Sequence, residues 1–196
     1  LNAGWVTTFN SYSIVSENRC TKIPKATKPY IGSLLGCAIT TGFGVIENNA
    51  KLKMGESIVV FGAGGIGLSI IQGALSVSAS TIIAVDIHEN RLQLAKKIGA
   101  THVICSSKED PFERIENILG PNKLDVFIDN TGIAKIIEQG YSIIKNDGRL
   151  ILVGVPRKGD NINIFSLPLH FGKIITGSYG GECNPDKDIP RYLKHI

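Results

Sequence analysis

Three glycines stand where the sequence predicts that a strand turns into a helix. Gly62, Gly64 and Gly67 have the spacing G-x-G-x-x-G and directly follow the apolar run 57–61. In this motif the first glycine permits a tight turn, the second lets the backbone approach a pyrophosphate, and the third lets the helix pack closely on the strand. The amides and positive dipole end of the helix would hold the phosphates. The spacing, with Gly65 inside it, predicts a dinucleotide-binding turn, although glycines also serve ordinary turns.

An acidic residue supports this interpretation. A second apolar run, 81–85, ends in Asp86, nineteen residues after Gly67. An acid at about this distance accepts hydrogen bonds from the hydroxyls of the adenosine ribose, and its charge opposes a 2′-phosphate. The sequence therefore predicts NAD rather than NADP; the alternative is that Asp86 is only a solvated acid at a strand end.

The elements that must position these residues alternate along the chain. Asp110 can cap a helix with Pro111 at its first position, and Gly99 can end the helix before it. Strands that are apolar on both faces and alternate with helices predict an α/β fold, a doubly wound parallel sheet with ligands at the carboxyl ends of its strands. We expect further strands at 101–104, 124–129, 150–154 and 174–178, and helices at 66–77, 89–98, 111–120 and 133–145.

The first fifty residues have a different pattern. Residues 9–15 alternate roughly as a half-buried strand would, and two prolines then break regular structure. From residue 32 to about 49 apolar residues recur at helical intervals. Residues 1–30 do not resemble the start of a doubly wound domain.

Composition limits the classes of function. The chain has 196 residues with a net charge of +4, and its Lys and Arg residues are scattered, so nucleic acid is not implied. We find no apolar run expected to span a bilayer and no signal peptide at the N-terminus. The four cysteines lie far apart, which indicates neither a disulfide framework nor a self-contained zinc site and favours the cytoplasm. Because the chain lacks an initial Met and ends in a helical pattern, we expect it to belong to a longer protein.

Five segments resemble the zinc-dependent alcohol dehydrogenases of the medium-chain dehydrogenase/reductase superfamily, in the family's order and spacing. They are residues 36–44, 61–67, 85–86, 99–101 and 153–156. The resemblance extends over nearly the whole chain.

The resemblance implies a division of the chain. Residues 1–35 would be the last part of a GroES-like catalytic domain, 36–180 a Rossmann dinucleotide-binding domain, and 181–196 the start of the helix that returns to the catalytic domain. Cys37 stands where the family has its third catalytic zinc ligand. The other two ligands, including a histidine, lie outside this chain. Since catalytic zinc sites need three protein ligands, we expect this chain alone to hold no catalytic zinc and to be inactive.

The resemblance also implies further cofactor contacts. Residues matching the nicotinamide pocket are Thr41, Ile66, Val153, Val155 and Ser178; those near the adenosine are Arg91, Asn130 and Thr131, with Asp129 beside them. On composition alone, the branched apolar residues among them would be ordinary core residues.

The leading hypothesis is the cofactor half of an NAD-dependent, zinc-dependent alcohol or polyol dehydrogenase. Alternatives are a zinc-free quinone or enone reductase of the same superfamily, and a non-catalytic dinucleotide-binding module. Cys37 argues against the zinc-free enzyme. Family members commonly pair through the last strand of the sheet, so we also expect a homodimer through the apolar edge segment 173–178.

Overall fold

The computed structural model describes residues 11–195, and its centre is a six-stranded, entirely parallel sheet. The strand order is β3-β2-β1-β4-β5-β6, so the direction of winding reverses between β1 and β4. This confirms the doubly wound fold and places the switch point at the carboxyl end of β1. The strands are β1 (Ser57–Phe61), β2 (Thr81–Asp86), β3 (His102–Cys105), β4 (Leu124–Asp129), β5 (Ile144–Leu152) and β6 (Ile174–Gly177).

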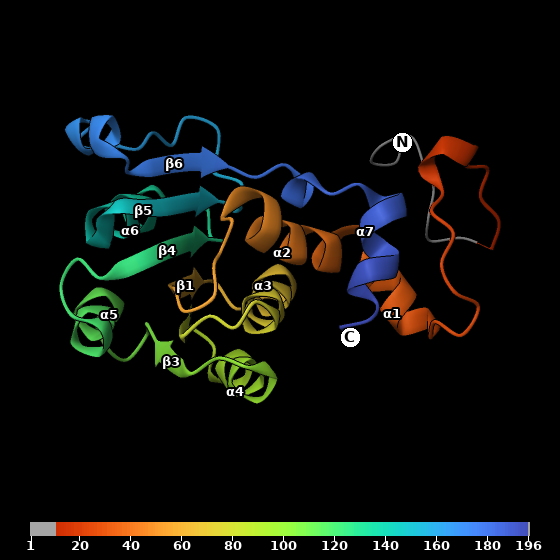
Figure 1. The fold of residues 1–196 in the computed structure, drawn as a ribbon, viewed down its shortest axis with the longest axis horizontal. Helices are drawn as coiled ribbons and strands as arrows, with labels where there is room; N and C mark the ends of the chain where they lie inside the picture. Colours follow the sequence, from red (N-terminus) through yellow and green to blue (C-terminus); the bar gives the residue numbers. More distant parts are fainter. Residues whose placement is uncertain (1–10, 196) are drawn as a thin grey trace.

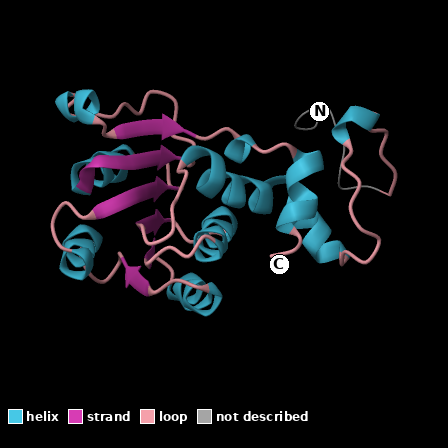
Figure 2. Ribbon diagram, viewed as in Figure 1, coloured by secondary structure: helices cyan, strands magenta, loops and turns pink. Residues whose placement is uncertain are grey.

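Helices cover both faces of the sheet (Figures 1 and 2). The two cores divide the strands by alternation: in β1, Ile58 and Val60 belong to one hydrophobic cluster, and Val59 and Phe61 to the other. The first cluster includes α3 (Gly65–Ser76) and α4 (Glu89–Ile98), and the second includes α5 (Pro111–Leu119) and α6 (Ala134–Ile143). Burial on both faces explains why the central strands are continuously apolar.

Local signals set the helix ends as expected. The Asp110 carboxylate accepts hydrogen bonds from the amides of Phe112 and Glu113, at 2.8 and 3.2 Å, and so caps α5. Gly99 ends α4 in a left-handed conformation, with φ at 131°. Most boundaries agree with the prediction to within two residues, and the largest difference among the strands is at the start of β5. Strand β5 begins at Ile144, where a helix was expected to continue, because Ile144 pairs with Leu124 before a bulge shifts the register.

One continuous helix precedes the sheet and runs from Pro29 to Asn49. It consists of α1 (Pro29–Leu34), a π-helical turn η3 (Leu35–Ile39), α2 (Thr40–Gly44) and a second π-helical turn η4 (Val45–Asn49). Contrary to our expectation, its 21 residues and mean hydropathy of 1.4 would suffice to cross a membrane by length and composition alone. Half of its most apolar 18-residue stretch is buried, as in a core helix, so this is weak evidence for a membrane span.

A second helix packs on this one. It is α7 (Pro185–Tyr192), which follows the short turn η6 (Gly180–Glu182), and its apolar side chains form a third cluster with the long helix. The other short turns are η2 (Glu17–Arg19) and η5 (Leu167–Phe171). In Figure 1 the long helix extends from the sheet to an outlying part of the molecule, which contains its own first turns, α1, together with α7 and residues 11–28.

The expected N-terminal strand is wrong where it can be checked. Phe9 and Asn10 lie outside the described residues, and residues 11–15 are exposed and form no strand. Within residues 11–195 the single sheet consists of β1 to β6, and residues 11–15 are not part of it. An alternation of apolar and polar residues therefore does not by itself form a strand, because a strand also needs a neighbouring strand to pair with.

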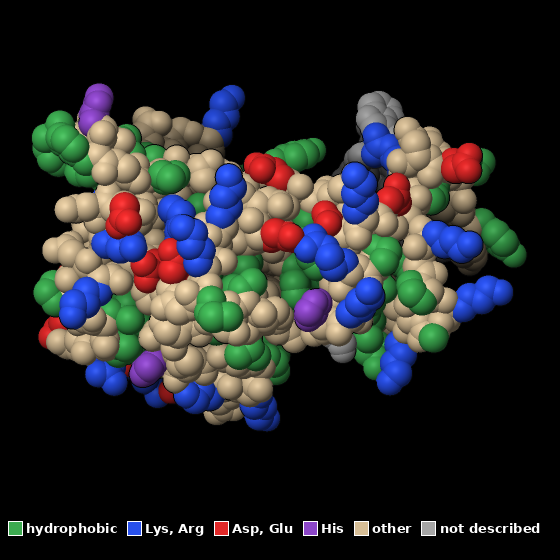
Figure 3. Space-filling model, viewed as in Figure 1, with side chains coloured by type: hydrophobic (Ala, Val, Ile, Leu, Met, Phe, Trp, Pro, Cys, Tyr) green, Lys and Arg blue, Asp and Glu red, His purple; other side chains and the backbone are tan. Residues whose placement is uncertain are grey.

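Charges are mixed over the visible surface. In Figure 3, Lys and Arg side chains are spread over the face shown and interspersed with acidic ones. This agrees with the scattered basic residues of the sequence.

Candidate functional site

The β1–α3 turn contains two glycines that the fold itself requires. Gly62 has φ at +97°, a conformation that side chains rarely adopt. A Cβ on Gly67 would lie 2.0 Å from the carbonyl oxygen of Gly62. The close contact between helix and turn expected from the motif is therefore present.

Gly64 is different, because nothing in the fold requires it to be a glycine. Its φ and ψ, −75° and −168°, are open to any residue, and an added Cβ would meet no atom within 4 Å. The Cβ of a residue at Gly65 would meet only Ala38, at 4.0 Å. The open space lies at the N-terminus of α3, where Leu68 makes the first bond to Gly64 and the preceding amides are free for an anion. This cradle fits the pyrophosphate of a dinucleotide.

Asp86 is held in a fixed orientation beside the turn. The residue is 5% exposed; its Oδ2 accepts the Ala63 amide at 2.8 Å, and its Oδ1 accepts the His88 amide at 2.9 Å. The half-exposed Arg91 places a guanidinium nitrogen 3.5 Å from Oδ2. A carboxylate can accept about four hydrogen bonds, so these contacts leave acceptor capacity for ribose hydroxyls.

Asn130, at the end of β4, contributes an unpaired acceptor. Its Nδ2 donates to the carbonyl oxygens of Phe61 and Gly62, at 3.4 and 3.3 Å. Its Oδ1 is buried without a hydrogen-bond partner among the described residues. Because buried polar atoms normally have partners, this atom is open to a donor from a ligand.

Asp129 has a structural role. The residue is fully buried, and its carboxylate accepts hydrogen bonds from the amide and hydroxyl of Thr131, at 3.0 and 2.6 Å, and from the amide of Gly132, at 2.9 Å. These bonds shape the turn after β4 and place Thr131 at the cleft.

The glycines of the turn, Asp86, Arg91, Asn130 and Thr131 line one cleft of about 800 Å³, a size ordinary for a ligand site. The cleft brings together most residues of the predicted cofactor set from four strand ends. They are Gly62, Gly64, Gly65, Ile66, Gly67, Asp86, Arg91, Asn130, Thr131, Val153 and Val155.

The cleft also contains residues that the sequence reasoning missed. Ile87 and Ser106 directly follow β2 and β3, so the rule of carboxyl strand ends could have found them. The other residues that were missed lie in α5 and α6 or directly before these helices, where no sequence pattern marks them as cleft residues. They are Asp110, Pro111, Phe112, Ile133, Lys135, Ile136 and Gln139. Phe112 stacks on Phe61 with ring centroids 5.7 Å apart, a contact between elements distant in sequence.

Three predicted residues lie outside the cleft lining. Thr41 is buried in α2, and the Ser178 hydroxyl accepts the Gly181 amide at 3.1 Å. Cys37 is a free, exposed cysteine in the π-helical turn η3. Over residues 11–195 no three His, Cys, Asp or Glu side chains gather as metal ligands, so these residues alone do not fit a catalytic zinc centre.

Comparison with known proteins assigns the family. Residues 65–196 match the family model described as zinc-binding dehydrogenase. The chain belongs to the zinc-binding dehydrogenase family. The chain is 34% identical over 192 residues to S-(hydroxymethyl)glutathione dehydrogenase of Haemophilus influenzae, covering 95% of the chain and 50% of that protein. It is 31% identical to alcohol dehydrogenase-like 7 of Arabidopsis thaliana, covering 96% of the chain and 50% of that protein.

Solved structures agree. The crystal structure of benzyl alcohol dehydrogenase from Acinetobacter calcoaceticus superimposes with a TM-score of 0.90 at 36% identity, over 96% of this chain and 52% of that one. A zinc-binding dehydrogenase of Sinorhizobium meliloti, described as putative and bound to NADP, has a TM-score of 0.77 at 26% identity, over 88% of this chain and 49% of that one.

The chain thus spans about half the length of the relatives it matches. It corresponds to the coenzyme-binding half of zinc-dependent medium-chain alcohol dehydrogenases, which confirms the resemblance drawn from the sequence.

Proposed function

We propose that this chain is the NAD-binding part of an NAD-dependent, zinc-dependent dehydrogenase that oxidises a small alcohol or polyol to an aldehyde or ketone. The observation that carries the proposal is the open cradle at Gly64 beside the buried carboxylate of Asp86. A glycine that the fold does not require, next to free helix amides, is explained by close approach of a phosphate.

Different residues of the cleft would bind different parts of the dinucleotide. The first amides of α3 would hold the pyrophosphate, and Asp86 would accept hydrogen bonds from both hydroxyls of the adenosine ribose. Val153 and Val155 follow β5, on the other side of the switch point, and would line the nicotinamide half. When bound, the nicotinamide supplies hydride transfer chemistry.

Asp86 favours NAD over NADP. A 2′-phosphate at the ribose would meet a buried carboxylate that two backbone amides hold in place. Arg91 is the nearest cation, and it already pairs with this carboxylate. We expect calorimetric titration of the chain to show weak binding of NAD and weaker binding of NADP.

Variants test this assignment. Asp86→Gly removes the carboxylate and frees Arg91, so the preference should shift toward NADP. Asp160→Gly, a change at an exposed acid of the β5–β6 loop, serves as the control and should leave the preference unchanged. Better binding of NADP than of NAD by the unmutated chain would contradict the role of Asp86.

Zinc would require ligands from outside this chain. Cys37 is exposed, so it can supply one thiolate ligand to a site completed by the rest of a longer protein. Metal analysis of this chain should find no stoichiometric zinc. Stoichiometric zinc that disappears in Cys37→Ser would contradict the proposal and reveal ligands not recognised here.

The assembly we propose is a homodimer through β6, in the cytoplasm. Strand β6 is the edge of the sheet, with Ile174 46% exposed. Exposed apolar side chains of the preceding loop and η5 lie nearby in the sequence: Phe165, Leu167, Leu169 and Phe171. An uncovered apolar edge strand favours pairing with a second copy around a twofold axis.

A further inference from the structure

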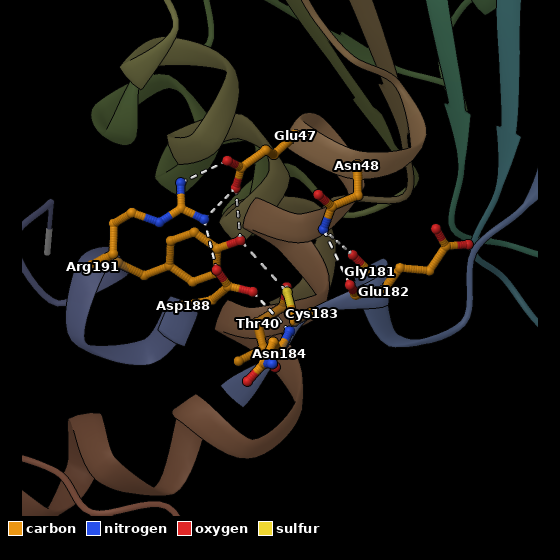
Figure 4. Close-up of polar contacts among 10 residues, drawn as sticks. Thr40, Glu47, Asn48, Gly181, Glu182, Cys183, Asn184, Asp188 and Arg191 are labelled. Atoms are coloured by element: carbon orange, nitrogen blue, oxygen red, sulfur yellow. Dashed lines mark hydrogen bonds and ion pairs between the residues drawn. The ribbon is translucent and has the colours of Figure 1, made fainter. Parts of the chain in front are cut away.

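A group of polar side chains fastens the long N-terminal helix to the segment that follows β6 (Figure 4). We call it the clamp: Glu47 and Asn48 on the helix, with Cys183, Arg191 and Tyr192 on the later segment. Glu47 and Arg191 are 144 residues apart in sequence and form a bidentate ion pair, with oxygen–nitrogen distances of 2.6 and 2.7 Å. The clamp therefore joins two parts of the chain that local sequence does not connect.

The ion pair is part of a network. Arg191 also donates to Asp188 at 2.7 Å, and the Tyr192 hydroxyl donates to Glu47 at 3.1 Å. The hydrogen bond from Arg191 lowers the pKa of Glu47, and burial raises the pKa of the Cys183 thiol. At neutral pH the network therefore contains an ionised Glu47 and a protonated Cys183.

Asn48 holds the turn itself. Its side-chain amide donates to the carbonyl oxygens of Gly181 and Glu182, at 2.8 and 3.3 Å. Backbone packing is tight here, because a Cβ on Gly44 would lie 2.3 Å from the Gly181 oxygen. Asn48 thus holds the turn against the helix at a point where two glycines, Gly44 and Gly181, allow the backbones to lie in contact.

The held turn lies between two residues of the proposed nicotinamide side. The Gly181 amide donates to the Ser178 hydroxyl at 3.1 Å. On its other side, a Cβ on Gly181 would lie 2.7 Å from the carbonyl oxygen of Thr41, so the Gly181 backbone packs directly on Thr41. The Cys183 thiol donates to the neighbouring Thr40 carbonyl at 2.8 Å. The clamp sets how Thr41 and Ser178 lie relative to each other.

The topology places both residues on one side of the cleft. Asp86 assigns the adenosine ribose to β2, so the other half of a dinucleotide must extend across the switch point toward β4, β5 and β6. Ser178 directly follows β6, and its amide donates to Leu152 at the end of β5. The helix of Thr41 passes the N-terminus of α3, where Ala38 approaches Gly65.

We propose that Asn48 and the Glu47–Arg191 pair are positioning residues that hold Thr41 and Ser178 in register for the nicotinamide half of the cofactor. The inference rests on the proposed function and adds residues outside the cleft to it. A clamp that only stabilised the fold would affect all ligands alike. A positioning clamp affects NAD and spares ADP-ribose, which has the same adenosine and pyrophosphate but lacks nicotinamide.

The experiment compares these two ligands. NAD and ADP-ribose are titrated calorimetrically into the unmutated chain, Asn48→Ala and Arg191→Lys, with thermal melts to show that each variant is folded. The controls are Asn161→Ala, at an exposed loop residue, and Arg114→Lys, at an exposed pair whose N–O distance is 3.9 Å. We expect the unmutated chain to bind NAD at least about threefold more tightly than ADP-ribose.

In Asn48→Ala, which loses both hydrogen bonds to the turn, the dissociation constant for NAD should rise about fivefold, with that for ADP-ribose changed less than about twofold. Arg191→Lys should act in the same direction, and the controls should change neither constant. Equal weakening of both ligands, or no change, in the folded variants overturns the inference. So does an unmutated chain that binds both equally, which leaves the adenosine half of the proposed function intact. A chain that binds neither ligand refutes the proposed function and this inference together.

Discussion

Glycine-to-alanine substitutions in the β1–α3 turn can separate an effect on folding stability from an effect on ligand binding. In Gly67→Ala the new Cβ would lie 2.0 Å from the Gly62 carbonyl oxygen, more than an ångström short of ordinary contact at 3.4 Å. A backbone oxygen cannot rotate away as a flexible side chain can. We expect a loss in the free energy of unfolding near the upper end of the overpacking range, about 3 kcal/mol. For a domain of this size the melting temperature should fall by roughly 6–12 °C.

The same change at Gly64 should leave the fold intact. Its φ and ψ suit alanine, and the Cβ meets nothing within 4 Å. A smaller loss of chain entropy on folding, worth about 0.4–1 kcal/mol, opposes the poorer helix cap that alanine provides. The melting temperature should therefore stay within about 3 °C of the unmutated value. The Cβ would, however, occupy the space proposed for the pyrophosphate, so NAD affinity should fall at least about tenfold, or 1.4 kcal/mol.

Circular dichroism melts and calorimetric titration with NAD measure the two effects separately. Gly36→Ala is the matched control, because Gly36 also has no atom within 4 Å of an added Cβ and lies outside the cleft lining. It should keep its NAD affinity. A Gly64→Ala chain that binds NAD normally would refute the role of the cradle, and a Gly67→Ala chain that melts normally would refute the steric reasoning.

Three further outcomes are expected. Ile175→Pro should give a monomer by light scattering where the unmutated chain is a dimer. The Ser178 amide points toward β5, and amides alternate in direction along a strand, so the amide of Ile175 faces the open edge, where proline would remove it. A monomeric unmutated chain would contradict this prediction. Glu47→Gln should reduce the loss of stability on acidification. The pKa of Glu47 is lowered in the folded state, so its ion pair stabilises the fold above the unfolded value of 4.5, and this stabilisation is lost as pH falls through the folded pKa. For so exposed a pair it is at most about 1 kcal/mol, and equal acid melting curves of the variant and the unmutated chain would contradict this prediction. Asp110→Ala should cost about 1 kcal/mol of stability, whereas Asp110→Asn retains the cap and should cost little; equal melting temperatures of the two variants would show that the cap is unimportant.

The sequence alone was sufficient for the sheet and its order of elements. Strands buried on both faces need apolar runs, and such runs are visible at 58–61 in β1, 82–85 in β2 and 126–128 in β4 without knowledge of their neighbours. The helix ends at Asp110 and Gly99 depend on contacts within one turn, so local sequence determines them too. The same holds for the glycine motif, because its steric demands arise within the six residues from Gly62 to Gly67.

Only the tertiary structure decided which side chains meet across the fold. Phe112 and Lys135 reach the cleft because α5 and α6 pack beside the strand ends, and no local pattern marks them. Residues 11–15 alternate like a strand, but in the described chain they do not belong to the sheet. The pairing of Glu47 with Arg191 spans 144 residues. Local preferences act over a few residues, whereas such contacts exist only after burial of the apolar faces has brought distant segments together.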